Sequence, residues 1–341
     1  MGITVLSLFD GISCGQLALT NLGYKIDKYY ASEIDKNAIK ITNKNFPNTI
    51  QIGDIEKITI EDIKKIDKID LILGGSPCQG FSRAGLGLNF EDPRSKLFFK
   101  FVEVLEWVRK FNNQDVKFLF ENVKMKKEWE EVISKHLNIE AIEINSKLLT
   151  AQNRSRLYWT NIKGIKGPKD KGIKLIDILD NVELENYIVK DSLKICKSIS
   201  DNSVNLINVI NGEVRINQAT KQGYIVANEG DGINLSFPLS KNRRGRVIKE
   251  KSSCLDTQCN ICVYANNAIR RFTINELEKL QGLPIGYTLC DEVSERNRMK
   301  AIGNGWTIDV IEYILGFMKI SSINTEIVVD EYNNEQLRFC I

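Results

Sequence analysis

Short apolar segments alternate with amphipathic ones through the first half of the chain. The apolar segments have the length of strands, and those between them carry apolar residues about every 3.6 positions, as helices do. The predicted strands are 4–9, 29–32, 50–53, 69–74, 117–120, 139–144 and 157–162. The predicted helices are 15–22, 35–45, 59–66, 94–111 and 126–137. This alternation predicts an α/β fold with a doubly wound, mostly parallel sheet.

The alternation stops near residue 163, where Gly and Asn become frequent and only short β-like pieces remain, at 187–189, 224–227 and 261–264. Helical spacing returns at 273–281 and at 306–318, the latter after a Gly303-Asn304-Gly305 turn. A chain of 341 residues exceeds the usual size of one compact core, which favours a main domain with an inserted lobe. The predicted division is a main domain at 1–165, a β-rich lobe at 166–267, a return to the main domain at 268–320 and a peripheral tail at 321–341.

Residue types that bind ligands or react follow five of the predicted strands. In an open α/β sheet, ligands bind outside the carboxyl ends of the strands. We therefore expect these segments to meet at one rim of the sheet. They are Phe9-Asp10-Gly11-Ile12-Ser13-Cys14-Gly15, Glu33, Asp54, Ser76-Pro77-Cys78-Gln79 and Glu121-Asn122.

The first three of these segments favour an adenosine-type ligand. Glycines in the loop at 9–15 let a ligand approach the backbone, and Phe9 can stack on a base. Glu33 stands where a carboxylate often binds ribose hydroxyls, and Asp54 after the third strand favours an adenosine over a dinucleotide. The chain has no Gly-x-Gly-x-x-Gly and no Walker Gly-Lys-Ser/Thr, which disfavours NAD enzymes and P-loop ATPases.

The remaining segments supply candidate chemistry. Cys78 follows a proline at a strand end, which suits a nucleophilic thiolate, although buried cysteines are more often inert packing. Glu121 within an apolar run is a candidate general acid or one half of a structural salt bridge. Gln152-Asn153-Arg154-Ser155-Arg156 places two arginines on one face of an extended segment, either to bind a carbonyl oxygen and a phosphate or as part of a solvated strand.

Composition narrows the class of protein. With 43% hydrophobic and 27% charged residues, the chain is globular rather than collagen-like, disordered or mucin-like. The net charge of the whole chain is only +3, but residues 163–271 hold 18 basic and 12 acidic residues. This local excess of positive charge permits a polyanionic partner. No apolar stretch is long enough for a membrane span and no basic leader precedes the first strand, so we expect a cytoplasmic protein without a membrane partner.

Cysteine and histidine usage excludes further classes of site. Eight scattered cysteines argue against a disulfide framework, and His136 is the only histidine, which excludes chemistry that needs two. The spacing Cys254-x4-Cys259-x2-Cys262 has no nearby histidine, so we predict no metal.

Together these motifs resemble the DNA cytosine-C5 methyltransferases over residues 5–162 and 270–315. Ser-Pro-Cys-Gln, Glu-Asn-Val and Gln-x-Arg-x-Arg match that family's nucleophile, acid and arginine motifs in order and spacing. Arg271-Phe272-Thr273 through Gln281-Gly282-Leu283-Pro284 is similar to the family's penultimate motif, and Gly303-Asn304-Gly305-Trp306 to its last. The resemblance implies a fold that binds S-adenosylmethionine, a target-recognition lobe, and a last helix that folds back to complete the cofactor site.

The resemblance also implies roles for individual residues. The catalytic residues would be Cys78, Glu121, Arg154 and Arg156. Contacts to S-adenosylmethionine are expected from Phe9, Asp10, Gly11, Ile12, Gly15, Glu33, Ile34, Asp54, Ile55, Pro77, Leu97, Asn304, Gly305 and Trp306. Contacts to DNA are expected from Gln79, Ser82, Arg243, Arg244 and Arg246. Two positions depart from the pattern, since many bacterial members have Gly where this chain has Cys14 and Ser where it has Gly305.

By this resemblance the enzyme would flip a cytosine out of double-stranded DNA, with residues 79–92 as the lid, and add Cys78 to C6 before methylation at C5. The isoleucine, lysine and asparagine bias suggests a bacterial or phage origin. The resemblance implies a protein at the nucleoid, with a cognate restriction endonuclease encoded elsewhere as a further partner. Three alternatives remain. An RNA (tRNA) cytosine-C5 methyltransferase would carry a Cys-Phe-Thr signature, which is absent here, and an amino-methylating enzyme would carry Asp-Pro-Pro-Tyr rather than Ser-Pro-Cys-Gln. A catalytically silent DNA-binding regulator would be expected to have lost Cys78 or Glu121, and both are present.

Overall fold

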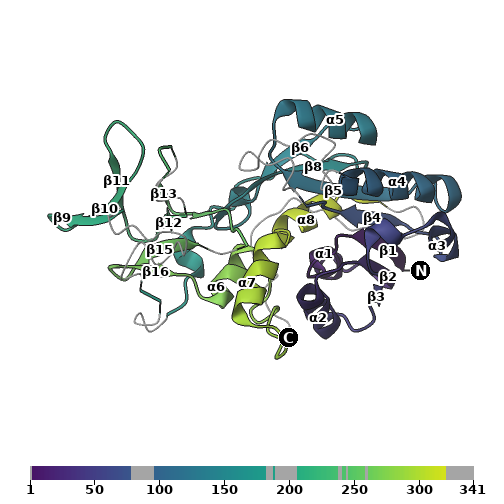
Figure 1. Cartoon of the computed structure of the whole chain (residues 1–341), viewed down its shortest axis with the longest axis horizontal. Coiled ribbons are helices and arrows are strands. Elements are labelled where there is room, and N and C mark those ends of the chain that lie inside the picture. Colours follow the sequence, from purple (N-terminus) through teal and green to yellow (C-terminus); the bar gives the residue numbers. More distant parts are fainter. Residues whose placement is uncertain are drawn as a thin grey trace.

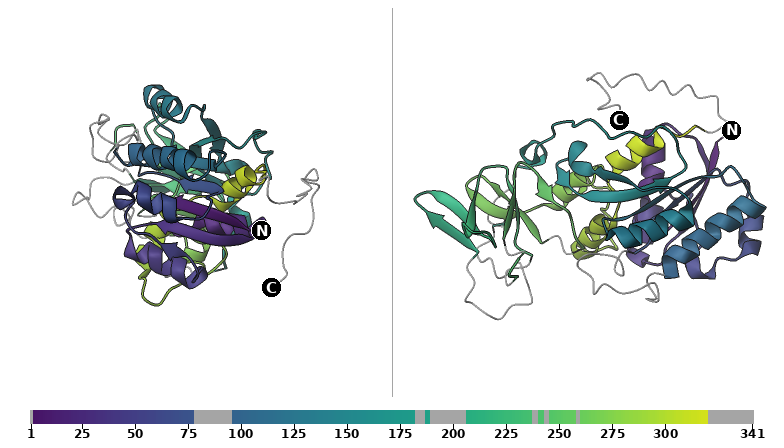
Figure 2. Two further views of the ribbon diagram at one scale, coloured as in Figure 1. Left: turned by 90° about the vertical axis from the view of Figure 1, so that its right-hand side faces the viewer. Right: turned by 90° about the horizontal axis from the view of Figure 1, so that it is seen from above.

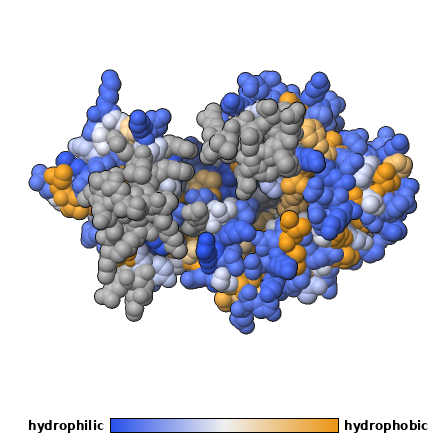
Figure 3. Space-filling model, viewed as in Figure 1, coloured by the Kyte–Doolittle hydropathy of each residue, from blue (hydrophilic) through white to orange (hydrophobic). Residues whose placement is uncertain are grey.

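The computed structural model describes residues 2–77, 96–181, 187–188, 206–236, 240–242, 245–257 and 260–319. These residues form a larger α/β lobe and a smaller lobe built mainly of β-strands, which extends to the left in Figure 1. The space-filling view shows a surface hollowed between the two lobes (Figure 3). No helix in the described part of the chain is long and apolar enough to cross a membrane.

A seven-stranded sheet with the order β3-β2-β1-β4-β5-β8-β6 forms the centre of the larger lobe. The first five strands in that order pair in parallel, whereas β8 is antiparallel to both of its neighbours. The predicted α/β class with a mostly parallel sheet is therefore confirmed. The strands are β1 (Ile3–Leu8), β2 (Ile26–Ser32), β3 (Ile50–Gln51), β4 (Leu71–Gly74), β5 (Lys117–Val123), β6 (Ile142–Asn145) and β8 (Ser155–Thr160).

Helices cover both faces of this sheet (Figures 1 and 2). The side chains of β1 alternate between two apolar cores, with Ile3 and Val5 in one and Leu6 and Leu8 in the other. A strand buried on both faces reads as a continuous apolar run, which is why the sequence predicts this strand clearly. The first core includes residues of α1 (Cys14–Asn21), α2 (Lys36–Asn45) and α8 (Ile308–Leu315), and the second includes residues of α3 (Ile60–Lys65), α4 (Lys96–Phe111) and α5 (Lys127–Leu137).

The smaller lobe contains two antiparallel sheets around a small apolar core of its own. A three-stranded sheet joins β9 (Ile207–Ile210), β10 (Glu213–Asn217) and β11 (Tyr224–Ala227). A four-stranded sheet joins β12 (Gly232–Asn234), β13 (Arg246–Ile248), β15 (Ile261–Ala265) and β16 (Ala268–Arg271). β16 thus continues the lobe's sheet past the predicted boundary at residue 267.

One short pair of strands joins the lobe to the main sheet's rim. β14 (Ser252–Ser253) pairs in parallel with β7 (Gln152–Asn153), the strand that immediately precedes the arginine pair. Three short 3-10 helices complete the described elements, η1 (Ile55–Lys57), η2 (Ser146–Leu148) and η3 (Leu175–Ile178). The chain segment after the lobe then returns to the main domain through α6 (Ile274–Leu280) and α7 (Glu295–Asn304).

The predicted Gly303-Asn304-Gly305 turn is wrong, because Gly303 and Asn304 form the end of helix α7 and only Gly305 follows it. The sequence gives little signal for this helix, since Met299 and Ile302 are its only large apolar residues. The predicted helix at 306–318 begins at Ile308 and packs on α1. Tyr24 anchors this packing by donating a hydrogen bond of 2.9 Å to the carbonyl of Met318.

A fully buried ion pair fixes the junction between the lobe and α6. Arg270 on β16 donates two hydrogen bonds of 2.8 and 2.7 Å to the carboxylate of Glu276 on α6, and both side chains are completely inaccessible to solvent. The same carboxylate accepts hydrogen bonds from the backbone N–H groups of Thr273 and Asp180. Because two charges are buried here, each depends on the other for its stability.

We expect Glu276→Gln to lower the free energy of unfolding by about 3–5 kcal/mol, because it leaves the Arg270 charge buried without a counter-charge. Glu106→Gln provides a matched control, since Glu106 pairs with Arg109 on the surface of α4 and its loss should cost less than about 0.5 kcal/mol. Urea denaturation of both variants measures the difference. Equal losses in the two variants would contradict the structural role given to the buried pair.

Candidate active site

Glu121 lies on β5 near the carboxyl end of the parallel strands, and its side chain is almost completely buried. Each of its carboxylate oxygens contacts one donor. Arg156 Nε on the neighbouring strand β8 lies 3.0 Å from Oε1, and Trp306 Nε1 donates to Oε2 at 3.0 Å. The acid predicted from the sequence is therefore held between a predicted arginine and a residue predicted for the cofactor site.

The end of β4 adjoins this carboxylate. A Cβ atom at Gly75 would lie 3.0 Å from Trp306 Nε1 and 3.2 Å from Glu121 Oε2, closer than most such contacts, so any larger residue would press against both side chains. The next residue, Ser76, is buried and accepts hydrogen bonds from the side-chain amide of Asn122 at its carbonyl and hydroxyl oxygens, at 3.4 and 3.3 Å. The segment that leads into Cys78 is thus fixed to the strand that carries the acid.

Cys78 itself lies outside the described residues, as do Gln79, Ser82, Arg243 and Arg244. Pro77, the last described residue before Cys78, is exposed at the rim. Arg246 begins β13 in the smaller lobe and is exposed. The candidate nucleophile and most of the candidate DNA contacts therefore remain predictions from the sequence.

Arg154 binds backbone carbonyls rather than pointing into solvent. Its guanidinium donates to the carbonyl oxygens of Leu255 at 3.3 Å, Gly303 at 3.4 Å and Gly305 at 3.1 Å. These residues come from the segment after β14 and from the end of α7. Arg154 therefore joins the rim of the sheet to two distant parts of the chain, and its position excludes the alternative of a solvated surface strand.

Cys254 lies between the two arginines, a contact that the sequence analysis missed. Arg154 Nη1 lies 3.4 Å and Arg156 Nη2 3.6 Å from its sulfur, and Cys254 is partly buried. In the sequence this cysteine stands out only as part of a metal-like spacing, whereas Cys262 of the same set is buried in the core of the smaller lobe. The position of Cys254 just after β14, which pairs with the strand before the arginines, places it here.

Two buried glutamine side chains connect the segments around the site. Gln281 donates to the carbonyls of Ile302 at 2.8 Å and Gly305 at 3.0 Å, and accepts from Thr307 Oγ1 at 2.9 Å. Gln152 donates to the Gln281 side chain at 2.9 Å and accepts from the backbone N–H of Leu255 at the same distance. Every hydrogen-bonding group of these two amides stays inside the protein, so their partners fix one another's positions.

The loop after β1 has a strained backbone that sets its shape. Phe9, Gly11 and Ser13 have φ angles of 61°, 59° and 56°, in the left-handed region that non-glycine residues rarely adopt. The Asp10 carboxylate stabilises the loop by accepting hydrogen bonds from the hydroxyls of Ser13 and Tyr29. Burial raises the pKa of Asp10 to about 6, against the opposing effect of these hydrogen bonds.

Glu33 joins this loop to the end of β2. Its carboxylate accepts backbone hydrogen bonds from Gly11 at 2.8 Å, from Ile34 at 2.7 Å and from Asp35 at 2.8 Å. The adjacent Ile34 side chain is 72% exposed, which is unusual for a large apolar group. The structure therefore brings the first two predicted cofactor segments together at the rim, with an apolar side chain beside a fixed carboxylate.

Other predicted cofactor residues have structural contacts. A Cβ on Gly15 would lie 2.4 Å from Leu73, so this glycine permits α1 to pack closely on β4. The side chains of Ile12 and Ile55 are buried in the two cores, and Leu97 is partly buried against the second. Asp54 caps η1 through the backbone N–H of Glu56. For these residues any ligand contact would come from exposed backbone or side-chain atoms.

The two departures from the family pattern are neighbours in space. A Cβ atom at Gly305 would lie 3.3 Å from the sulfur of Cys14, closer than most such contacts. Burial raises the pKa of the Cys14 thiol to about 12, so it remains protonated. The extra side chain at position 14 thus occupies the space beside position 305. Of the two residues around this glycine, Trp306 is partly buried and Asn304 is exposed.

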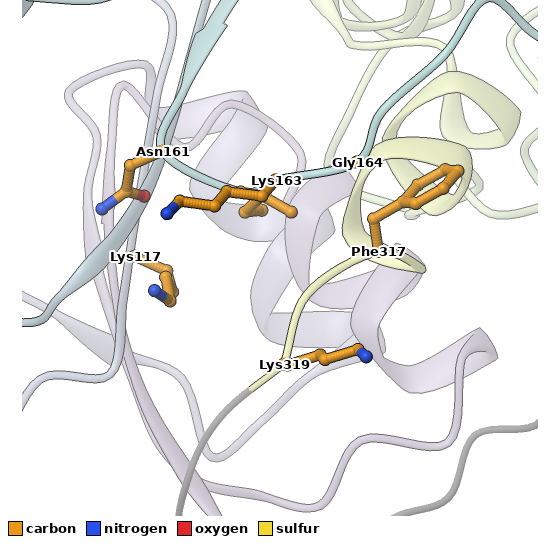
Figure 4. Close-up of a pocket in the computed structure, with 7 residues that line it drawn as sticks. Lys117, Asn161, Lys163, Gly164, Phe317 and Lys319 are labelled. Carbon is orange, nitrogen blue, oxygen red and sulfur yellow. The ribbon is translucent and has the colours of Figure 1, made fainter.

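A cavity of about 320 Å³ lies away from these residues. Lys117 at the start of β5, Asn161 after β8, and Lys163, Phe317 and Lys319 surround it (Figure 4). The start of β5 is the end of the strand opposite to Glu121, so this cavity is separate from the candidate site.

Comparison with known proteins agrees with this arrangement. The family model described as C-5 cytosine-specific DNA methylase matches residues 3–319. The type II methyltransferase M.HpaII of Haemophilus parainfluenzae is 27% identical, with 91% of this chain and 87% of that protein covered. The orphan methyltransferase M.SPRI of Bacillus phage SPR is 38% identical over 174 residues, which cover 47% of this chain and 38% of the phage protein. The match thus spans well under half the length of that phage relative.

Solved structures show the same fold. A Dnmt2 methyltransferase of S. pombe has a TM-score of 0.63 at 20% identity, with 92% of this chain and 97% of that chain covered. The methyltransferase EhMeth of Entamoeba histolytica has a TM-score of 0.62 at 19% identity, with 93% and 98% covered. Since the family model extends across nearly all of the described structure, the chain belongs to the C-5 cytosine-specific DNA methylase family.

Proposed function

We propose that the protein is a sequence-specific DNA cytosine-C5 methyltransferase that uses S-adenosylmethionine and forms a covalent bond between Cys78 and C6 of a flipped cytosine. One observation supports this proposal above the others. The buried Glu121 carboxylate lies between Arg156 and Trp306 and beside Gly75, three residues before Cys78. An acid, an arginine and the approach to a cysteine nucleophile thereby meet at one rim of the sheet.

The residues at the rim suit S-adenosylmethionine by their chemistry. Glu33 is a fixed carboxylate that can accept hydrogen bonds from ribose hydroxyls, and the exposed Ile34 offers an apolar surface to an adenine ring. The backbone at Gly11 is open, since a Cβ atom there would meet nothing within 4 Å. We therefore assign cofactor binding to this rim, together with Asp54 and the segment from Asn304 to Trp306.

The proposed reaction makes the cytosine ring electron-rich before methylation. The Cys78 thiolate forms a bond to C6, and the negative charge that develops at N3 is stabilised by a proton or hydrogen bond from Glu121, which acts in its protonated form. Arg156 binds the O2 atom, while Arg154 holds the loop in place through its backbone contacts. S-adenosylmethionine, when bound, supplies the methyl group. Loss of the proton from C5 then allows the bond between sulfur and C6 to break.

DNA is the substrate that we propose over RNA. The family description and the type II names of M.HpaII and M1.ScrFI, the latter from Lactococcus lactis, concern DNA methylases and type II methyltransferases. The smaller lobe provides two antiparallel sheets on the far side of the surface hollow from the main domain. Its sequence carries the excess of basic residues, as phosphate binding requires. A cognate restriction endonuclease would be a further partner.

The charges of Arg154 and Arg156 create a positive electrostatic potential that the proposed chemistry needs. The pKa of the Cys254 thiol, which lies between the two arginines, responds to this potential. Burial acts to raise the pKa of the Cys254 thiol, but the charges of Arg154 and Arg156 outweigh it and lower the pKa below its usual value. The same potential would stabilise negative charge on a bound base. By contrast, burial raises the pKa of Cys262 to about 12.

We expect expression of the protein in a host that lacks DNA methylation to produce 5-methylcytosine at one short DNA motif, as read by base-resolution conversion sequencing. Cys78→Ser should abolish the modification, because a hydroxyl is a far weaker nucleophile than a thiolate. Methylation that persists in this variant would rule out the covalent mechanism. Modification of RNA alone would assign the protein to an RNA substrate, and no modification at all would indicate a silent DNA-binding regulator.

Neutralising Arg243, Arg244 and Arg246 together should weaken DNA binding. For each phosphate contact that is lost, the slope of log K against log salt concentration should become shallower by about 0.9. Neutralisation of Lys64, Lys65 and Lys68 is the matched control, because it removes the same charge from the exposed surface near α3. Fluorescence anisotropy at several salt concentrations measures both variants, and identical slopes in the two would exclude these arginines from the interface.

The rate at which iodoacetamide alkylates Cys254 should increase with pH, with a midpoint at a lower pH than for a free cysteine. The reason is that the lowered pKa of Cys254 allows the reactive thiolate to form at a lower pH. Arg156→Gln should shift the midpoint of this pH dependence upward. Cys14 and Cys262 should stay unlabelled at pH 8, because their pKa values are about 12. Peptide mass spectrometry separates these sites, and a midpoint unaffected by Arg156→Gln would contradict the proposed potential.

A further inference from the structure

The two donors that hold Glu121 differ in kind. Arg156 is charged, and besides Glu121 it binds the carbonyl oxygen of Ser155 at 2.9 Å and the sulfur of Cys254 at 3.6 Å. In the proposed reaction it binds O2 of the cytosine. Trp306 offers a single neutral N–H on a rigid ring, and that N–H can donate but never accept a hydrogen bond. Arg156 thus shares its donors among several acceptors, whereas the Trp306 N–H is directed at Glu121 alone.

Trp306 has little freedom to move away from Glu121. The preceding residue, Gly305, donates its backbone N–H to the last turn of α7, and its carbonyl accepts hydrogen bonds from Arg154 at 3.1 Å and Gln281 at 3.0 Å. Gly75 lies against the indole on one side, since an added Cβ there would come within 3.3 Å of Trp306 Cζ2. The indole N–H is thus a fixed donor, set before any substrate binds.

We propose that Trp306 is a positioning residue for Glu121, which fixes Oε2 so that Oε1 alone is released from Arg156 and presented to N3 of the cytosine. This inference rests on the function proposed above. In the resting protein Arg156 occupies Oε1. When the base enters, Arg156 moves to O2 of the base and Oε1 takes up a proton from water, which it donates to N3 as Cys78 adds to C6 and regains when the sulfur leaves. The hydrogen bond from Trp306 meanwhile prevents the carboxyl group from turning.

A positioning role accounts for the contact between Trp306, which lies at the cofactor rim, and the Glu121 carboxylate. Trp306 belongs to the segment between α7 and α8 that also borders Cys14 in the cofactor loop. A donor placed there connects the cofactor side of the site with the side that holds the base. A fixed donor aimed at a buried carboxyl group costs no rearrangement during the reaction, which is how hydrogen bonds contribute most to rate.

The test uses Trp306→Phe, which keeps an aromatic ring but removes the N–H donor together with part of the indole. The first readout is exchange of the C5 hydrogen of cytosine with water, measured without cofactor. The substrate is an unmethylated DNA duplex that contains the recognition motif and carries tritium at C5 of its cytosines. This exchange follows addition at C6 and so reports Cys78 and Glu121 directly. We expect its rate, and kcat for methylation, to fall by about tenfold or more, as for loss of one hydrogen bond to a charged group. The KM for DNA should change far less, and the exchange readout is independent of any loss of cofactor affinity because no cofactor is present.

Trp107→Phe is the matched control, since Trp107 lies on α4 and stacks under the Lys100 ammonium away from the site. A second comparison separates positioning from a general structural effect. If Trp306 acts through Glu121, then Trp306→Phe added to Glu121→Ala should slow exchange no further than Glu121→Ala alone.

The outcomes are distinct for the two proposals. A wild-type protein that neither exchanges the C5 hydrogen nor methylates DNA would overturn the proposed function. A wild-type protein that does both, with a Trp306→Phe variant that exchanges at the same rate, would overturn only the positioning role. Independent, additive losses from Trp306→Phe and Glu121→Ala would overturn it as well.

Discussion

A single buried side chain, the amide of Gln281, joins the parts of the chain from which the candidate site is built. It binds Gln152 before the arginine pair, the carbonyls of Ile302 and Gly305 at the end of α7, and the hydroxyl of Thr307 before α8. Because an unsatisfied buried amide is costly, these segments cannot separate without loss of stability. Because Gly305 is one of these partners, the position of the next residue, Trp306, beside Glu121 depends on this constraint.

The same constraint explains how the smaller lobe reaches the site. Gln152 also accepts the backbone N–H of Leu255, next to Cys254, and β14 pairs with β7 just beside it. The pairing of β14 with β7 therefore fixes where the smaller lobe contacts the arginine pair. A movement of the lobe relative to the main domain would act first on Arg154 and Arg156, which both contact Cys254.

The sequence predicts the centre of the main sheet well because β1, β4 and β5 are buried on both faces, and the candidate functional residues lie at or just after the ends of strands. Glu33 and Glu121 could be located in this way from the pattern alone. The contact between Trp306 and Glu121 could not, since 185 residues separate them and no local pattern encodes the pairing. Helix α7 and the short strands of the lobe were missed or only partly recognised for a related reason. They bury few apolar residues, and tertiary contacts rather than periodicity decide their conformation.

The close approach of positions 14 and 305 has a consequence for recombination between family members. A chimaera that takes its amino-terminal half from this chain and its last segment from a relative with serine at position 305 would press a new Cβ against the sulfur of Cys14, at 3.3 Å. The reverse chimaera, with glycine at both positions, would leave an unfilled space beside Trp306. The first loop and the last segment should therefore be inherited together, as one functional unit divided between the two ends of the chain.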